Sequence, residues 1–390
     1  MHKKLVRMMA LIAPMAAVQP AQAVEVGGVE LTGSGFMTLG VGQMIGGTKH
    51  DVMDRHCPCF AADYAQGGVY DGRSGLQWQP DTKLGLQGTA KVTSDLSFTT
   101  QVVARGARNG AADLEWLYGS YRFNDALTLQ VGRKRLPMFY YSDTQDVGFA
   151  LPWTHLPPQL YGWEAVNYNG INLTYRTQAG SWDLTGDLLY GGESYRNSGY
   201  DKIYYGKYNK TNVKWDAILG GVFAFSRDWF EGRMVYIQSH TRNRIMNGTF
   251  DDGYSAPDAD WTNFARQRIY GASANIDYEN FLLRSEVIYI DRPEATFKDH
   301  ATIIGAGYRF GKWTPMITRS QYRGQANIAN GGDPLGQEGH VTMAYTLRYD
   351  LTTSSAIKLQ YDDQRDKGGP NWTPNYGNAK LVTLTYDMVF

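Results

Sequence analysis

The chain has 390 residues, with 38 basic and 38 acidic side chains and therefore no formal net charge. A balanced chain of this kind argues against bulk binding to nucleic acid, which needs an excess of positive charge. The mean hydropathy is −0.42, yet the sequence holds 27 Tyr and 44 Gly against only 14 Pro. This combination is typical of β-strands whose side chains alternate between an apolar face and a watery one.

The first 23 residues have the three parts of a secretory signal peptide. Three of the first seven residues are basic, residues 8–17 form a short apolar run, and residues 21–23 read Ala-Gln-Ala, a small-residue cleavage site. We prefer this interpretation to an N-terminal helix of the folded protein, because all three parts occur together. We therefore expect a signal peptide at 1–23 and a mature domain at 24–390. No later stretch approaches the roughly 18 consecutive apolar residues of a membrane-spanning helix.

Segments with alternating apolar and polar residues follow one another through the mature chain. Tight polar turns, such as 124–125, alternate strictly with mostly long connections, such as 135–163. An up-and-down antiparallel barrel has this arrangement, because one rim carries turns and the other carries loops. We therefore predict an all-β fold, a 16-stranded antiparallel transmembrane barrel. Its expected strands are 30–44, 78–92, 96–105, 113–123, 126–134, 164–177, 181–190, 212–225, 229–242, 264–278, 281–290, 299–310, 313–324, 339–350, 354–364 and 379–390.

The alternation also assigns each residue to a face. Leu84 and Leu86 belong to an apolar series, for example, whereas Lys83 and Gln87 belong to the polar series between them. We expect the apolar series to face lipid and the polar series to line a water-filled lumen, since sixteen strands enclose an aqueous channel. The main soluble alternative is a large β-sandwich or propeller. A propeller needs a motif repeated about every 40 to 50 residues, and the sequence has no such repeat.

The last ten residues read LVTLTYDMVF, and their apolar series runs to the final residue, Phe390. Chain ends usually fray unless something holds them. The pattern therefore predicts that this segment is the last strand of a closed sheet.

The signal peptide, the sixteen segments, the alternating connection lengths and the terminal Tyr-x-x-x-Phe, from Tyr386 to Phe390, together resemble a Gram-negative outer-membrane general porin. The resemblance covers the mature chain. It implies passive diffusion of small hydrophilic solutes and ions through the bacterial outer membrane, with turns in the periplasm and loops outside. It also implies no enzymatic activity, no cofactor and no nucleic-acid partner. The expected partners are the solutes, outer-membrane lipid, two further copies in a homotrimer, and the barrel-assembly machinery, for which Phe390 would be the assembly signal.

By the same resemblance, the third long connection folds into the barrel and narrows the pore. The segment 131–164 begins with a basic cluster that includes Lys134 and Arg135, continues with Asp143 and Asp146, and ends in an apolar, proline-bearing half. Its apolar groups would pack on the barrel wall while its charges set a field across the pore. The alternative is a mobile surface loop, but such a loop would expose many large apolar groups together, which is unfavourable.

The alternation of faces also assigns charged side chains of several strands to the inner wall of the pore. Arg319 and Arg323 are less certain members of this set. The inward basic residues slightly outnumber the acidic ones, so we expect a weak preference for anions, because rings of charged side chains set ion preference in pores. The expected pore constriction consists of Lys134, Arg135, Asp143, Asp146, Arg105, Arg284 and Arg348.

The first long connection contains both cysteines of the chain, within HDVMDRHCPCF. His50, His56, Cys57 and Cys59 are weak candidates for zinc or copper, since imidazole and thiolate suit those ions. The spacing is not that of a zinc site. In an oxidising compartment the Cys-x-Cys pair can instead form a local disulfide or stay as free thiols. We expect no metal here.

Three other functions remain open. A substrate-specific channel differs from a general one by only a few loop residues. An outer-membrane enzyme would need a nucleophile and a base together, but in Ser239-His240 adjacent strand residues point to opposite faces. A plugged receptor would need an N-terminal globular domain, and the first expected strand begins almost directly after the cleavage site. The receptor and an adhesin barrel together are the third alternative.

Overall fold

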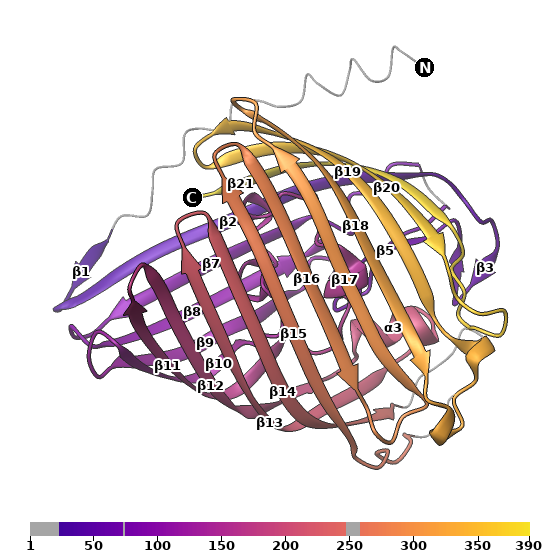
Figure 1. Cartoon of the computed structure of the whole chain (residues 1–390), viewed down its shortest axis with the longest axis horizontal. Coiled ribbons are helices and arrows are strands. Elements are labelled where there is room, and N and C mark those ends of the chain that lie inside the picture. Colours follow the sequence, from indigo (N-terminus) through magenta and orange to yellow (C-terminus); the bar gives the residue numbers. More distant parts are fainter. Residues whose placement is uncertain (1–22, 73–74, 247–257) are drawn as a thin grey trace.

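The computed structural model describes residues 23–72, 75–246 and 258–390. Within these residues, sixteen long antiparallel strands close into one barrel (Figure 1). The expected signal peptide, apart from Ala23, lies outside the described residues. The barrel strands are β2 (Val29–Gly47), β7 (Lys83–Lys91), β8 (Leu96–Arg105), β9 (Ala112–Arg122), β10 (Leu127–Arg135), β11 (Asn167–Ala179), β12 (Trp182–Tyr195), β13 (Thr211–Arg227), β14 (Phe230–Ile245), β15 (Ala265–Tyr278), β16 (Phe281–Asp291), β17 (Phe297–Tyr308), β18 (Trp313–Ala326), β19 (Gly339–Thr352), β20 (Ser355–Asp366) and β21 (Ala379–Val389).

Each expected strand corresponds to one barrel strand, so the predicted fold class is confirmed. Neighbouring strands are joined alternately by short turns and by longer connections, which places the turns at one rim and the long connections at the other; we call these the turn rim and the loop rim. Among the residues described, no helix has the length and apolar character needed to cross a membrane.

Smaller elements lie in the connections. The first connection holds two short hairpins and the fourth holds a helix, none of which the alternation of apolar residues predicted. These elements are β1 (Val24–Val26), which pairs with the start of β2, β3 (Asp51–Val52), β4 (Arg55–His56), β5 (Phe60–Asp63), β6 (Gly68–Tyr70), α2 (Pro158–Tyr161), α3 (Gly199–Tyr205) and the 3₁₀ turns Gly106–Arg108, Ser142–Thr144, Gly148–Ala150, Ile328–Asn330 and Pro334–Gly336.

The barrel closes at β2, which pairs with β7 on one side and with β21 on the other. The end of the chain is fixed at this seam. The N–H of Phe390 donates to the carbonyl of Gly35 at 2.9 Å, and the N–H of Gly35 donates back at 2.6 Å. The Phe390 ring covers Gly35 so closely that a Cβ there would lie 2.5 Å from a ring carbon. The sequence pattern therefore identified the closing strand correctly.

Alternation of the faces is also clear in the strands. Leu84 and Leu86 are 44% and 57% exposed on the outer face, while Thr383 and Asp387 of β21 are fully buried on the inner face. One assignment was wrong. Arg319 and Arg323 are exposed, whereas their neighbours Thr318 and Ser320 are buried, so both arginines of β18 point outward. Polar residues occupy both faces at this end of β18, and a polar–apolar pattern cannot assign a face there.

We predict that deleting Phe390 lowers the amount of folded barrel in the membrane. The deletion removes two backbone hydrogen bonds to Gly35, each contributing about 0.5–1.5 kcal/mol, together with the ring that covers the seam. The measurement is the fraction of heat-modifiable, membrane-inserted protein. Phe310→Ala is the control, because this aromatic ring is 61% exposed at the turn rim and closes no seam. An undiminished folded fraction in the deletion would refute the assignment.

Candidate functional site

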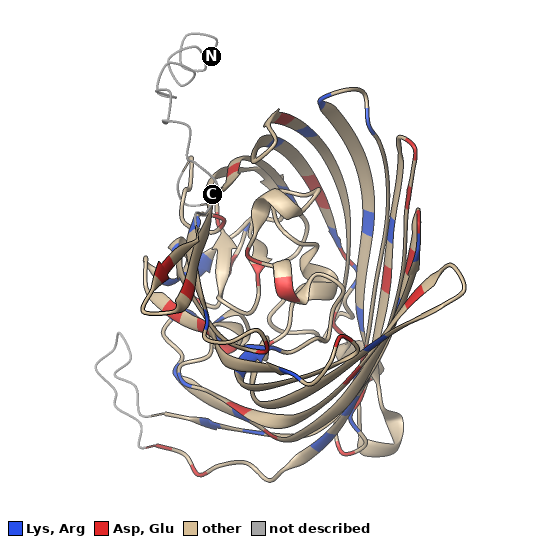
Figure 2. Cartoon of the chain, turned by 90° about the vertical axis from the view of Figure 1, so that its left-hand side faces the viewer, with Lys and Arg blue, Asp and Glu red and all other residues tan. Residues whose placement is uncertain are grey.

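The third long connection, residues 136–166, lies inside the barrel; we call it the lumen loop. Figure 2 shows coil and short helices within the ring of strands. The apolar side chains of the lumen loop pack against the inner faces of β13 to β18, where they form the largest buried cluster. Its members include Leu136, Met138, Phe139, Leu151, Trp153, Leu160 and Trp163 from the loop and Val213, Trp215, Ile218, Val235, Ile237, Ile269, Ile288, Ile290 and Ile303 from the wall.

This part of the wall is apolar on both faces, whereas we expected the inner faces to be polar. In β14, Val235 and Ile237 are buried inside while Met234 and Tyr236 are exposed outside. A strand with both faces covered by apolar surroundings becomes a nearly continuous apolar run. The runs MVYI in β14 and VIYI in β16 are that signal, and they distinguish this wall from the alternating strands elsewhere.

Polar side chains of the wall fix the course of the lumen loop. Arg348 donates to the carbonyl of Phe149 at 2.7 Å, and Lys358 donates to that of Gly148 at 2.8 Å. Arg284 donates to the Tyr141 hydroxyl at 3.1 Å. The structure therefore places Arg284 and Arg348 in contact with the loop, where they hold its backbone and a hydroxyl.

A buried ion cluster fixes the same loop at Asp146, two residues before Gly148. Asp146 accepts from Arg105 at 2.7 Å and also pairs with Arg135. Glu115 pairs with both arginines, at 2.6 Å and 2.9 Å. Burial would raise the pKa of Asp146, but Arg105 and Arg135 outweigh it and hold that pKa well below the usual range. Of the expected constriction residues, the structure thus brings Arg105, Arg135 and Asp146 into direct contact.

Lys134 and Asp143 are placed differently. Lys134 comes from the inner face of β10, with its Nζ 5.3 Å from the centre of the Tyr118 ring and a hydrogen bond to Gln130. Asp143 is exposed on the lumen loop. Its charge acts on Lys134 without a direct ion pair in the described structure. These two opposite charges are therefore available to water in the part of the lumen that the loop leaves open.

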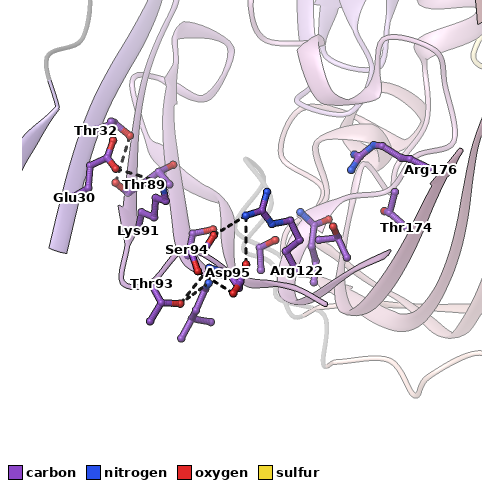
Figure 3. Close-up of a pocket in the computed structure, with 15 residues that line it drawn as sticks. Glu30, Thr32, Thr89, Lys91, Thr93, Ser94, Asp95, Arg122, Thr174 and Arg176 are labelled. Carbon is purple, nitrogen blue, oxygen red and sulfur yellow. Dashed lines mark hydrogen bonds and ion pairs between the residues drawn. The ribbon is translucent and has the colours of Figure 1, made fainter. Parts of the chain in front are cut away.

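The open part of the lumen continues to the turn rim along the polar inner faces of β7 to β11. A cavity of about 400 Å³ lies there. Figure 3 shows Glu30 and Lys91, paired at 3.6 Å, on one side and Arg176 on the other. Arg122, between them, donates to the carbonyl of Ser94 at 3.1 Å. This wall can hydrate and conduct ions, unlike the apolar wall under the lumen loop.

The four metal candidates of the first connection make other contacts. Cys57 and Cys59 form a local disulfide, so neither sulfur is a thiolate ligand. His50 bonds the carbonyl of Asn375 at 2.6 Å, while His56 pairs with Asp51. The described residues contain no group of three or more His, Cys, Asp or Glu side chains suitable for a metal ion.

Two further segments, the first connection and helix α3, also enter the lumen. His155 of the lumen loop lies 3.1 Å from Asp81 of the first connection and 3.5 Å from Asp362 of the wall. Burial alone would lower the pKa of His155, but these two carboxylates outweigh it and raise the pKa to about 10. Helix α3 brings Tyr200 and Tyr204 against Tyr64. The sequence carried a signal for α3, because its N-cap residue Ser198 accepts from the third residue on, as S-x-x-D segments do.

We predict that Asp146→Asn loosens the lumen loop within a folded barrel. The change leaves Arg105 and Arg135 buried around Glu115, with only a longer contact from Arg105 to Asp113 at 3.4 Å in addition. Removing one partner of a buried ion pair costs about 3–5 kcal/mol. Limited proteolysis of the heat-modifiable protein should cut the loop faster. Asp143→Asn is the control, since Asp143 is exposed and forms no ion pair in the described structure. Equal cleavage of both variants would contradict the anchoring role.

Comparison with known proteins identifies solved structures that share this fold. No family model matches the chain, and no curated protein matches it. Solved structures do match. The outer membrane channel DcaP of Acinetobacter baumannii is 11% identical, with 95% of this chain and 100% of that chain covered and a TM-score of 0.59. The anion-selective porin of Comamonas acidovorans is 13% identical, over 93% and 100%, with a TM-score of 0.54. OmpT of Vibrio cholerae, in a trimer form, is 8% identical, over 93% and 99%, with a TM-score of 0.55. At these identities the likeness concerns the fold: the chain has the fold of the outer-membrane porins.

Proposed function

We propose that the chain forms a channel in the bacterial outer membrane through which small hydrophilic solutes and ions diffuse passively. The observation that carries the proposal is the division of the lumen. The lumen loop covers the apolar wall of β13 to β18, and what remains is bordered by the polar faces of β7 to β11. Sixteen strands enclose more space than their own side chains fill, so this remaining side provides a hydrated path.

We place the narrowest part of this path between Lys134 and Asp143. Lys134 lies partly exposed on the wall and Asp143 lies exposed on the loop, and the charge of Asp143 acts on Lys134. Arg105 and Arg135 are neutralised by Asp146 and Glu115 in a buried cluster. Arg284 and Arg348 hold the loop. These residues therefore act on passing ions indirectly, through the position of the loop. A weak anion preference fits the excess of Lys91, Arg122 and Arg176 over the acidic residues at the turn rim.

A channel for particular solutes is the second candidate. The observation that favours it is the filling of the lumen by three segments: the lumen loop, the β5–β6 hairpin and α3. Each added segment narrows the path and adds specific side chains to it. Enzyme and adhesin functions have no comparable support in the described structure. The trimer form described for the Vibrio cholerae protein supports a homotrimer here.

We predict opposite selectivity changes for two single substitutions. Lys134→Gln should shift selectivity toward cations, and Asp143→Asn toward anions. A unit charge about 8 Å from an ion in water changes its energy by roughly 0.5 kcal/mol, so each permeability ratio should change by about a factor of two. The measurement is the zero-current potential across a planar bilayer with a salt gradient.

The control is Lys49→Gln, which changes a charge on the first connection outside the expected constriction. It should leave the potential nearly unchanged. If the wild type conducts and both test variants have its zero-current potential, Lys134 and Asp143 do not line the constriction. A folded, inserted barrel that does not conduct would refute the channel function itself.

A further inference from the structure

Three connections meet at the loop rim and enclose a second cavity, away from Lys134 and Asp143. It has a volume of about 460 Å³ and lies between the first connection, the turn after β8 and helix α3. This is the size of pockets that hold small organic molecules, and it exceeds what a single hydrated ion needs. We call it the outer cavity.

The walls of the outer cavity are closely packed. A Cβ at Gly199 would lie 2.5 Å from the carbonyl carbon of Gln66, and one at Gly106 would lie 2.4 Å from the carbonyl oxygen of Gln79. Gly106 also donates to the carbonyl of Thr82 at 2.8 Å. Close backbone approach of this kind needs glycine at both positions. The three connections therefore form one defined wall, so the cavity does not depend on the chance position of a single loop.

The charge lining the outer cavity has one sign. Arg55, Arg108, Lys202 and Lys207 line it, and no Asp or Glu is among its lining residues in the described structure. The whole chain has equal numbers of acidic and basic residues, so four cations without a lining carboxylate are a local concentration. Burial, with the nearby charges of Arg108 and Lys210, lowers the pKa of Lys202.

These cations are only partly neutralised by their neighbours. Arg108 has one distant partner, Asp113, at 3.5 Å. Lys207 lies over the Tyr208 ring at 4.6 Å, and Lys202 has no ion pair in the described part of the chain. Arg55 interacts with Tyr376, although its Nε atom has no hydrogen-bond partner. Cations with so few carboxylate partners can be matched by an anionic ligand.

We propose that the outer cavity binds small organic anions that carry two or more carboxylate or phosphate groups, and so collects them at the mouth of the channel. Two arginines suit the planar, bidentate geometry of such groups, and two lysines add point charges from another element. The proposal rests on the proposed channel function and names the class of solute that the channel would take up. An anion with a single charge would leave most of the four cations unmatched.

The test is direct binding to the purified, detergent-solubilised barrel by isothermal titration calorimetry at low salt. Citrate and glucose 6-phosphate are the carboxylate and phosphate probes, and glucose is the neutral control. We expect either anionic probe, or both, to bind and glucose to give no heat. The double variant Lys202→Gln with Lys207→Gln should bind roughly tenfold more weakly, a loss of about 1.4 kcal/mol, because it removes two of the four cations that line the cavity. Arg55→Gln, on a different connection, should weaken binding in the same direction.

Lys210→Gln is the matched control, because Lys210 is exposed on the same connection and does not line the cavity. Its effect should stay within about twofold. No binding of either anion, or an equal loss in the Lys210 variant, would overturn the proposal. Planar-bilayer conductance separates the two levels: a conducting barrel that binds neither anion refutes this inference alone, and a non-conducting barrel that binds them refutes the channel and leaves an anion-binding site.

Discussion

The contact on which this structure depends is the burial of the lumen loop against an apolar inner wall. Trp153 and Leu151 of the loop, with Ile237 and Ile288 of the wall, are almost completely removed from water. Without the loop, the inner faces of β13 to β18 would expose a large apolar surface to a hydrated lumen, which is unfavourable. The loop therefore completes the barrel as a folded structure as well as narrowing it, and the position of the channel follows from which wall the loop covers.

Burying the loop imposes a second requirement, because its backbone and its charged residues leave water with it. An unpaired buried charge or carbonyl is costly. The wall meets this requirement at fixed points: Lys358 and Arg348 donate to loop carbonyls, and Asp146 of the loop pairs with Arg105 and Arg135. The loop is thus held near its middle, at residues 146–149, by side chains from several strands, and its exposed residues are held at defined positions with it.

The strands could be predicted from the sequence, whereas the role of each charged residue could not. The difference lies in how far along the chain the deciding interactions reach. Strand periodicity is local: alternation around Leu84 or Thr383 assigns a face whatever lies opposite. Whether Arg105 faces water or a carboxylate depends on Asp146, which is forty-one residues away in the sequence. A local pattern of apolar and polar residues cannot predict such a contact. The apolar inner wall could also have been predicted, since VIYI in β16 departs from alternation. We instead expected the lumen to be polar throughout. Arg319 was assigned wrongly where polar residues occupied both faces.

Charged residues in this lumen therefore fall into two groups that composition cannot separate. Arg135 and Lys134 are adjacent in sequence, yet one is buried against Glu115 and Asp146 and the other lies near water beside Tyr118. Strict alternation would place Arg135 on the outer face, yet at the end of β10 its side chain joins Glu115 and Asp146 in the buried cluster. A net charge summed over inward residues counts both alike, although only an unpaired charge close to the path acts strongly on a passing ion. Selectivity in such a barrel is consequently a property of the few charges that packing leaves unpaired, and the packing of the lumen loop decides which ones they are.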